Sequence, residues 1–459
     1  MPQPATTSGA HTHTRPARPS ATLAVTGAAT AVALMNYTAP MLTLPDTAAA
    51  FGTPESARAW LLNGTPLGLA VLLLVAGSLA DAHGRRRVFL LGTLALGVTT
   101  GLGAFAGSTL AFTLARIAQG AASAAVLAGS LGLLADAYPS GRDRIRATAI
   151  WGASVSGGIA LGPLLAGALS LVDWRLAYAV LGLGALVIAA AGTYGLPRDT
   201  TQRPVRTRPD IPGAVALGLA LAALLTALTL GRDGWLRAPV GLLFLTAVAL
   251  TAIFAAVEHR SRTPMLDLAL LRRPAFLAST LGALFTGLAV IGLFSVVPAL
   301  LQSGAGMSPL GAAWLFVLWS GTAFVAALQA RRLAGRLSAA YQLTLGFVLS
   351  AAGVLALLGG LEGPWPRLLP GLLVAGAGSG LLNAALPRLA VDSVPPERAA
   401  MGSGANNTAR YIGSAAGVAL TLALTTAGPD TALLVSAGLA LTGAAITLVL
   451  GKRPGRRRG

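Results

Sequence analysis

Long apolar runs alternate with short polar or basic stretches along most of the chain. Most of these runs have the ~20 residues that an α-helix needs to cross the hydrocarbon core of a bilayer. Two runs, 212–230 and 239–257, are shorter, but clear polar stretches bound them. The pattern predicts fourteen membrane-spanning helices, at residues 21–44, 60–80, 88–107, 110–135, 147–170, 176–196, 212–230, 239–257, 275–301, 309–330, 341–361, 368–391, 401–426 and 431–451.

The basic residues favour one side of this arrangement. An even number of spans places both termini on the same side, which we take as the cytoplasmic side. The inner tails and loops then hold about five times as many arginines and lysines as the outer loops, as the positive-inside rule requires. The outer loops hold Arg58, Arg175, Arg232, Arg237 and Arg367, whereas Arg116 and Arg410 lie within predicted spans.

Composition agrees with a polytopic membrane protein. Of the 459 residues, 54% are hydrophobic and only 10% are charged, which is more apolar surface than a soluble domain of this size can bury. The net charge of +18 is explained by loop arginines facing anionic headgroups, and nucleic-acid binding is the remote alternative. Cysteine is absent, the four histidines are not paired as zinc ligands are, and no phosphate-binding loop precedes a Lys-Ser or Lys-Thr pair. We therefore expect no cofactor, no metal and no enzyme.

A polar hairpin separates the second and third predicted spans, with the sequence Gly77-Ser-Leu-Ala-Asp81-Ala-His-Gly84-Arg85-Arg86-Arg87. Gly84 suits a left-handed turn. Asp81 ends a helix, where a carboxylate opposes the macrodipole and needs a partner. The hairpin resembles the Gly-x-Leu-Ala-Asp-x-x-Gly-Arg-Arg loop signature of the major facilitator superfamily.

This resemblance implies an all-α polytopic membrane protein, with two six-helix bundles around a central cavity. The number of spans resembles the fourteen-helix drug:proton antiporter branch (EmrB/QacA-like), which has two extra central helices. The expected regions are a disordered cytoplasmic tail (1–20), an N-terminal bundle (21–196), the extra helices with their loops (197–274), a C-terminal bundle (275–451) and a basic cytoplasmic tail (452–459).

Two further motifs resemble that branch. Arg116, Gln119 and Gly120 lie on one face of the fourth span and resemble its Arg-x-x-Gln-Gly signature, which implicates the arginine in proton coupling. A purely structural buried arginine is the alternative. The fifth span resembles the antiporter signature, which we assign to Gly158, Gly162, Pro163 and Gly167. Small residues at this spacing allow helices to approach closely.

The chain departs from the branch in the first span, where Asn36 occupies the usual position of an aspartate. No acidic residue lies in the middle of a predicted span, and Asp46, Asp81, Asp136 and Asp392 lie at span ends. An asparagine does not titrate, so coupling uses other groups or differs from the branch. The coupling candidates are Arg116, Gln119 and Asp46.

Two other sets of residues are functional candidates. The resemblance to the superfamily implies that Asp81 meets the start of the thirteenth span near 400–402. With Asp136 pairing with Arg85 or Arg86, we expect a conformational latch on the inner side. Its members are Gly77, Asp81, Gly84, Arg85, Arg86 and Asp136. The substrate-cavity candidates are Asn36, Tyr37, Asn63, Gln302, Asn383, Asn407 and Arg410. Hydrogen bonding between helices is the alternative role for such single polar residues. Trp314 and Trp319 face either the cavity or lipid.

The sequence thus predicts a secondary active exporter of amphiphilic small molecules, of the multidrug efflux type, in the plasma (inner) membrane. The cavity candidates favour neutral or weakly acidic substrates over cations. We expect proton coupling, alternating access, contact with membrane lipid, a monomer, and both termini in the cytoplasm. The alternatives are a dedicated exporter or facilitator of one metabolite without standard proton coupling, and a non-transporting membrane sensor or scaffold.

Overall fold

The computed structural model describes residues 19–138, 141–197, 210–231, 234, 236–261, 268–333, 337–394 and 399–451. Every regular element in these ranges is a helix. The predicted basic tail (452–459) and nearly all of the predicted N-terminal tail (1–20) lie outside the described residues.

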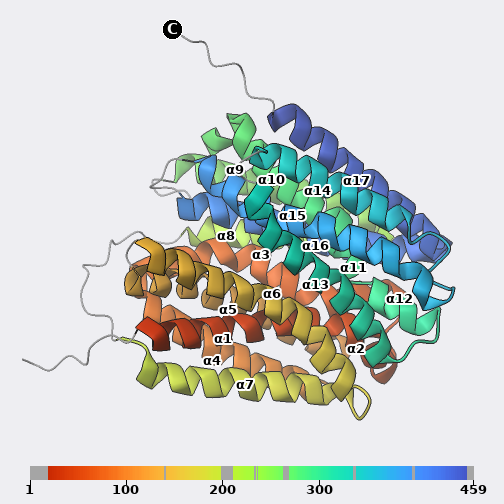
Figure 1. The fold of residues 1–459 in the computed structure, drawn as a ribbon, viewed down its shortest axis with the longest axis horizontal. Helices are drawn as coiled ribbons and strands as arrows, with labels where there is room; N and C mark the ends of the chain where they lie inside the picture. The colour runs from red at the N-terminus through yellow and green to blue at the C-terminus, as the bar shows by residue number, and fades with distance from the viewer. Residues whose placement is uncertain are drawn as a thin grey trace, which may run out of the picture.

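The first part of the chain forms helices that occupy the lower half of Figure 1. A break after Thr38 divides the first predicted span into two helices. The elements are α1 (Pro19–Thr38), α2 (Pro40–Ala50), the 3-10 turn η1 (Glu55–Ala57), α3 (Arg58–His83), α4 (Arg85–Ala104), α5 (Thr109–Ala137), α6 (Gly141–Leu169) and α7 (Trp174–Gly195).

The remaining helices follow α8 (Ile211–Gly231) and α9 (Ala238–Arg260), and most of them lie in the upper half of Figure 1. They are η2 (Leu268–Arg272), α10 (Pro274–Phe285), the π-helix η3 (Thr286–Ile291), α11 (Gly292–Phe294), α12 (Val297–Ser303), α13 (Pro309–Leu333), α14 (Ala339–Leu355), η4 (Trp365–Arg367), α15 (Leu368–Asp392), α16 (Ala399–Leu424), η6 (Thr425–Ala427) and α17 (Pro429–Gly451).

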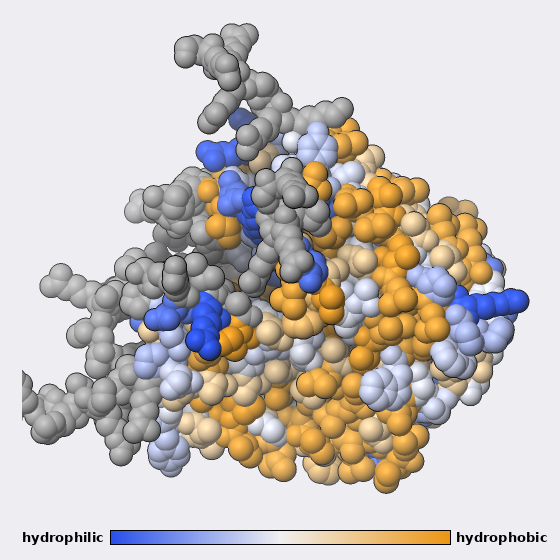
Figure 2. All heavy atoms as spheres, viewed as in Figure 1, coloured by the Kyte–Doolittle hydropathy of each residue, from blue (hydrophilic) through white to orange (hydrophobic). Residues whose placement is uncertain are grey.

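Each of the fourteen predicted spans contains helix. Nine helical segments among the described residues are long and apolar enough to cross a membrane by themselves. Figure 2 shows a broad hydrophobic surface over the visible helices, with hydrophilic residues gathered toward the edges. Exposed leucines and valines such as Leu102, Leu242 and Val248 suit contact with lipid rather than water. The membrane character is thus evident, and the number of crossings stays a prediction.

Three main pairs of helices among the described residues join the N-terminal and C-terminal halves of the molecule. α3 packs on α16, α6 packs on α13, and α2 packs on α12. The helix α8 contacts α9 and also reaches both α3 and α16, so it lies beside one of these junctions. The arrangement leaves the facing surfaces of α1, α6, α13 and α16 to enclose the space described next.

Two of the long helical segments are interrupted near the centre of the molecule. α1 ends before Pro40, whose ring lacks the N–H that would bond the carbonyl of Asn36. The segment from α10 to α12 changes to a π-helix at 286–291. There Gly287 and Gly292 approach the backbone of α16 closely. Such interruptions free backbone groups and are frequent at functional sites.

Candidate functional site

A cavity of about 90 Å³ lies between the two halves, and we call it the central cavity. Both interrupted segments contribute to its wall, as do α6, α13, α15 and α16. It is lined by Leu34, Tyr37, Thr38, Met41, Ser156, Ile159, Thr286, Val290, Ile291, Phe294, Ser295, Phe316, Trp319, Ser320, Ala323, Phe324, Ala327, Ser379, Asn383, Arg410 and Tyr411.

Aromatic rings form much of the wall. The rings of Phe294 and Trp319 are stacked, with centroids 4.3 Å apart and planes 8° apart. Phe316 meets the edge of Trp319 at 5.2 Å, and Tyr37 meets Tyr411 edge-on at 5.8 Å. This wall suits a ligand with a flat apolar ring, because offset stacking adds to the burial of aromatic surface.

The polar groups of the central cavity are mostly hydrogen-bond donors or hydroxyls. Arg410 is half-buried, and its guanidinium carbon lies 5.5 Å from the Tyr411 ring centroid. The Nε atom of Arg410 and the indole Nε1 of Trp319 are buried without a hydrogen-bond partner among the described residues. The described lining contains no aspartate or glutamate.

The cavity candidates from the sequence divide into two groups. Tyr37, Asn383 and Arg410 line the central cavity. Trp319 also lines it, whereas Trp314 is 59% exposed on the outer surface of the helices. The other candidates, Asn36, Asn63, Gln302 and Asn407, are outside its lining.

Three of these amides bond to another helix instead. Asn36 donates to Thr100 Oγ1 at 2.8 Å, Asn63 donates to the carbonyl of Ala415 at 2.8 Å, and Gln302 donates to a carbonyl in α2. For these three, the alternative role of hydrogen bonding between helices fits the geometry better. Asn407 donates to the carbonyl of Ser403 in its own helix at 3.0 Å.

The sequence reasoning missed Phe294, Phe316 and Tyr411 as cavity residues. In a helix that is apolar on all sides, periodicity does not distinguish a cavity-facing ring from a lipid-facing one. The pattern of apolar residues along the chain does not indicate the π-helix either, although this π-helix brings Thr286 and Val290 into the cavity wall. The glycines at 287, 292, 413 and 417 are the one sequence feature that accompanies it, because they let the two segments approach closely.

Arg116 lies in the core of the N-terminal half and is fully buried. Its Nη1 donates to the carbonyl of Asn36 at 2.8 Å and to Gln119 Oε1 at 2.6 Å. Because Pro40 provides no helical donor to the Asn36 carbonyl, the guanidinium takes that place. The Nε and Nη2 atoms have no partner among the described residues, and neither has Oδ1 of Asn36. Arg116 and Gln119 thus share one face of α5 and are hydrogen-bonded to each other, and the role of Arg116 in proton coupling stays a prediction.

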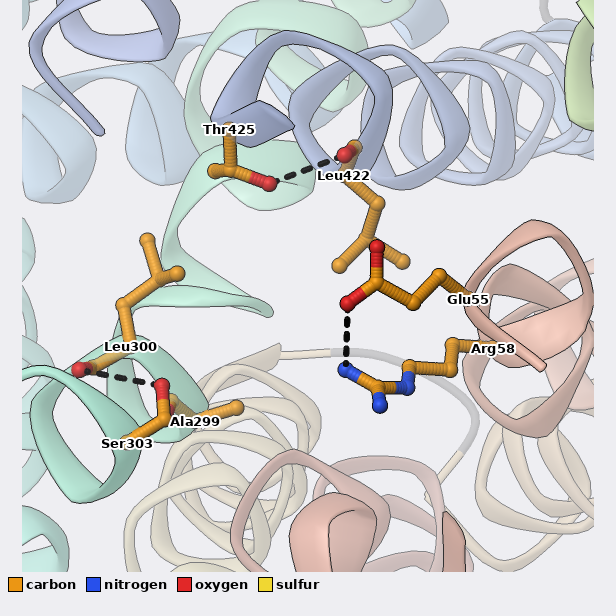
Figure 3. Close-up of polar contacts among 7 residues, drawn as sticks. All are labelled: Glu55, Arg58, Ala299, Leu300, Ser303, Leu422 and Thr425. Carbon is orange, nitrogen blue, oxygen red and sulfur yellow. Dashed lines mark hydrogen bonds and ion pairs between the residues drawn. The ribbon is translucent and has the colours of Figure 1, made fainter. Parts of the chain in front are cut away.

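A second cavity of about 530 Å³ lies at the ends of α2, α12 and α16, and we call it the end cavity. Figure 3 shows Glu55 and Arg58 on one side of it, with Ser303 and Thr425 from the other half across from them. Glu55 Oε1 and Arg58 Nη1 are 3.6 Å apart, and both side chains are substantially exposed. The end cavity is therefore wetter than the central one and opens at the surface of the bundle.

Among the described residues, three hydrogen bonds join the two halves between these cavities. The hydroxyls of Tyr37 and Ser414 are 2.9 Å apart. Asn63 Nδ2 donates to Ala415, and Gln302 Nε2 donates to the carbonyl of Leu42 at 3.1 Å. We call this set the interhalf bonds, because each joins a residue before 197 to one after 274.

The hairpin after α3 is only partly described. Gly84 has a φ of +97°, the positive value that a glycine turn accommodates. Arg85 Nη1 lies 2.7 Å from Asp136 Oδ1, and Arg86 Nη2 donates to the carbonyl of Thr193 at 2.7 Å. These contacts fix the start of α4 to α5 and α7 within the N-terminal half. The Asp81 side chain lies outside what the structure describes, so its predicted partner near 400–402 stays a prediction.

The small residues of the predicted antiporter motif pack against two different helices. A Cβ at Gly158 would lie 2.5 Å from the carbonyl oxygen of Ala31 in α1, and one at Gly162 would lie 2.8 Å from Cα of Met35. A Cβ at Gly167 would lie 2.9 Å from the carbonyl oxygen of Pro309 in α13. Gly77 has open space around it. The motif thus fixes α6 to α1 and, near its end, to the other half.

Asp46 follows the predicted first span and is half-buried in α2. Burial raises the pKa of its carboxyl above the usual 3.8, and the charge of Asp173 raises that pKa further. It does not line either cavity. Within the described residues no cluster of three or more acidic or histidine side chains could hold a metal ion.

Comparison with known proteins identifies a family and named relatives for this chain. The sequence matches the family described as Major Facilitator Superfamily over residues 26–418, and again over 279–459. It is 31% identical to Multidrug resistance protein Stp of Mycobacterium tuberculosis (strain CDC 1551 / Oshkosh), over 87% of this chain and 74% of that protein. It is 32% identical to Puromycin resistance protein pur8 of Streptomyces alboniger, over 87% of this chain and 80% of that protein.

The fold has a counterpart among solved structures. The crystal structure of an auto-inhibited POT family peptide transporter superimposes with a TM-score of 0.70, over 95% of this chain and 97% of that one, at 15% identity. That likeness concerns the fold alone. The family match and the relatives named above show that this is a membrane-embedded transporter rather than an enzyme. The chain belongs to the Major Facilitator Superfamily.

Proposed function

We propose that this protein exports amphiphilic small molecules across the plasma membrane as a secondary active transporter of the multidrug efflux type. The observation that carries the proposal is the central cavity between the two halves, with a largely apolar and aromatic wall and a few convergent polar groups. Such a lining is typical of small-molecule sites, which usually enclose ~300–1,000 Å³, so the central cavity must widen when the two halves move to admit a substrate. The names of the relatives, a multidrug resistance protein and a puromycin resistance protein, support the same function.

The proposed mechanism is alternating access by rocking of the two halves about the central cavity. In the described conformation the interhalf bonds lie between the central and end cavities. Breaking them would connect the two cavities, and we propose that the end cavity is the exit on the outer side. The Arg85–Asp136 pair and the rest of the hairpin form the inner latch in this scheme.

The fourteen-crossing topology with both termini in the cytoplasm is also part of the proposal. Because the chain has no cysteine, single cysteines can be introduced without background. Arg87→Cys and Arg237→Cys fall on opposite sides in this topology. A membrane-impermeant maleimide added to intact cells should label only Arg237→Cys. Equal labelling of both variants would contradict it.

Transport itself is tested with purified protein in liposomes. An imposed pH gradient, acidic inside, should drive accumulation of a fluorescent amphiphile, and substrate addition should release protons. Accumulation that is unchanged when the gradient is abolished would support the alternative of a facilitator without proton coupling. A protein that moves no member of an amphiphile panel would be a sensor or scaffold instead.

A further inference from the structure

The central cavity combines a flat ring platform with an unbalanced positive charge. Phe294 and Trp319 are parallel, and both are at least nine-tenths buried. Arg410 lines the same space, and no carboxylate accompanies it in the described lining. The three described ion pairs use Arg58, Arg85 and Arg388, so Arg410 has no ion-pair partner among the described residues.

Two buried donors in this wall are left without acceptors. Trp319 is 7% exposed, yet its indole N–H has no partner among the described residues. Nε of Arg410 is likewise unpartnered. A buried donor without an acceptor is costly, and a bound acceptor atom removes that cost. Both groups therefore favour a ligand that presents oxygen acceptors or a negative charge.

We propose that the substrates of the central cavity are planar aromatic molecules bearing an acidic or anionic oxygen group. The ring stacks against the Phe294–Trp319 platform, and Arg410 binds the oxygen group. The proposal rests on the exporter function proposed above and narrows its substrate class.

The opposite reading is an aromatic site for cations, because ring faces attract positive charge. That attraction falls off within a short distance of the ring. The charge of Arg410 acts over a longer range in a low-dielectric site and repels a cation throughout the cavity. With no acidic residue in the described lining to offset it, repulsion outweighs ring attraction.

The test is equilibrium binding of two dyes that share a xanthene ring system and differ in charge. Purified full-length protein in nanodiscs is titrated with anionic fluorescein and, separately, with cationic rhodamine 6G, and fluorescence polarisation is measured. We expect fluorescein to bind at least about ten-fold more tightly, since a hydrogen bond to a charged group contributes that much or more. Equal affinities, or tighter binding of rhodamine 6G, would overturn the proposal, and this result needs only the wild-type protein.

Variants assign the effect to the named groups. Arg410→Gln should weaken fluorescein binding roughly ten-fold or more, whereas Arg410→Lys should keep most of it. Arg388→Gln, which removes an exposed arginine outside the cavity, is the matched control. Trp319→Phe keeps an aromatic ring but removes the pyrrole ring with its N–H, and it should weaken fluorescein binding, with exposed Trp314→Phe as its control. If fluorescein binding is unchanged in Arg410→Gln, the assignment is wrong.

Transport of the same dyes separates this inference from the proposed function. Proteoliposomes that move rhodamine 6G but not fluorescein would support the exporter and overturn the substrate class. Fluorescein binding that depends on Arg410, without transport of either dye, would support the site and contradict the exporter.

Discussion

At the scale of single residues, Arg116 is the least expected group, because it is fully buried and no acid lies opposite it in the described core. Its guanidinium donates a hydrogen bond to the carbonyl of Asn36, which has no helical donor because residue 40 is a proline. The sequence contained both parts of this arrangement, the span arginine and the proline four residues after Asn36. It did not indicate that the guanidinium would bind a backbone carbonyl and the Gln119 amide oxygen rather than a carboxylate.

Asn36→Asp should therefore stabilise the protein. It places a carboxylate on a residue whose backbone already contacts the guanidinium, and Nε and Nη2 of Arg116 have no partner among the described residues. The variant also loses the bond that Asn36 Nδ2 donates to Thr100 Oγ1, and we expect the charge pairing to outweigh that loss. Removing one partner of a buried ion pair lowers the free energy of unfolding by about 3–5 kcal/mol. Supplying a carboxylate to the unpaired Arg116 should therefore raise that free energy, by about 1–3 kcal/mol. Thermal unfolding in detergent measures it. Asn406→Asp, which loses donors to Ser279, is the destabilised control. A lower Tm for both variants would contradict the pairing.

Asp46→Asn should stabilise the protein in a pH-dependent way. Since the pKa of the folded carboxyl lies above 3.8, the fold favours the protonated form. The stabilisation that the protonated Asp46 carboxyl gives to the folded state is fully present below pH 3.8. It is lost as pH rises through the raised pKa. The uncharged asparagine should thus raise Tm at pH 7, and the gain should shrink as pH falls toward 4. A gain equal at both pH values would show that charge is not the cause.

At the scale of elements, the apolar runs predicted where helices lie, because length and hydropathy suffice for that. They did not predict the π-helix at 286–291, since its apolar sequence continues without a proline. Nor did they orient the rings of Phe294 and Phe316. Those outcomes depend on packing between helices that lie far apart in the sequence, such as α11 with α16.

The helix α6 allows a matched test of close packing. Gly162→Ala would place a methyl group 2.8 Å from backbone atoms of Met35, whereas Gly157→Ala adds one in open space. Overpacking typically costs about 1–3 kcal/mol, so Gly162→Ala should lower Tm while Gly157→Ala leaves it unchanged or slightly raises it. Similar melting temperatures for the two variants would mean that α1 and α6 separate easily. In that case, the motif would not hold them together.

At the scale of the whole molecule, the two halves are joined by few polar contacts, as a rocking mechanism needs. Among the described residues, the interhalf bonds lie between the central and end cavities. Met41 lines the first cavity and Leu44 the second, so the bond from Gln302 to Leu42 falls between them. Each of these hydrogen bonds contributes about 1 kcal/mol, so the binding energy of a ligand is large enough to shift the equilibrium between the two conformations.

Weakening the interhalf bonds should therefore shift the population toward a state in which the cavities connect. Asn63→Ala removes the bond to Ala415, and about 1 kcal/mol corresponds to a roughly five-fold change in the ratio of two states. A single cysteine at Ser320, in the central cavity and outside the interhalf bonds, reports the shift through its rate of reaction with a water-soluble maleimide added on the outer side. Thr43→Val, which removes a 2.8 Å contact with Tyr178 inside one half, is the control and should not change that rate. If both variants change it equally, access depends on general loosening of the bundle, and the interhalf bonds do not form the gate.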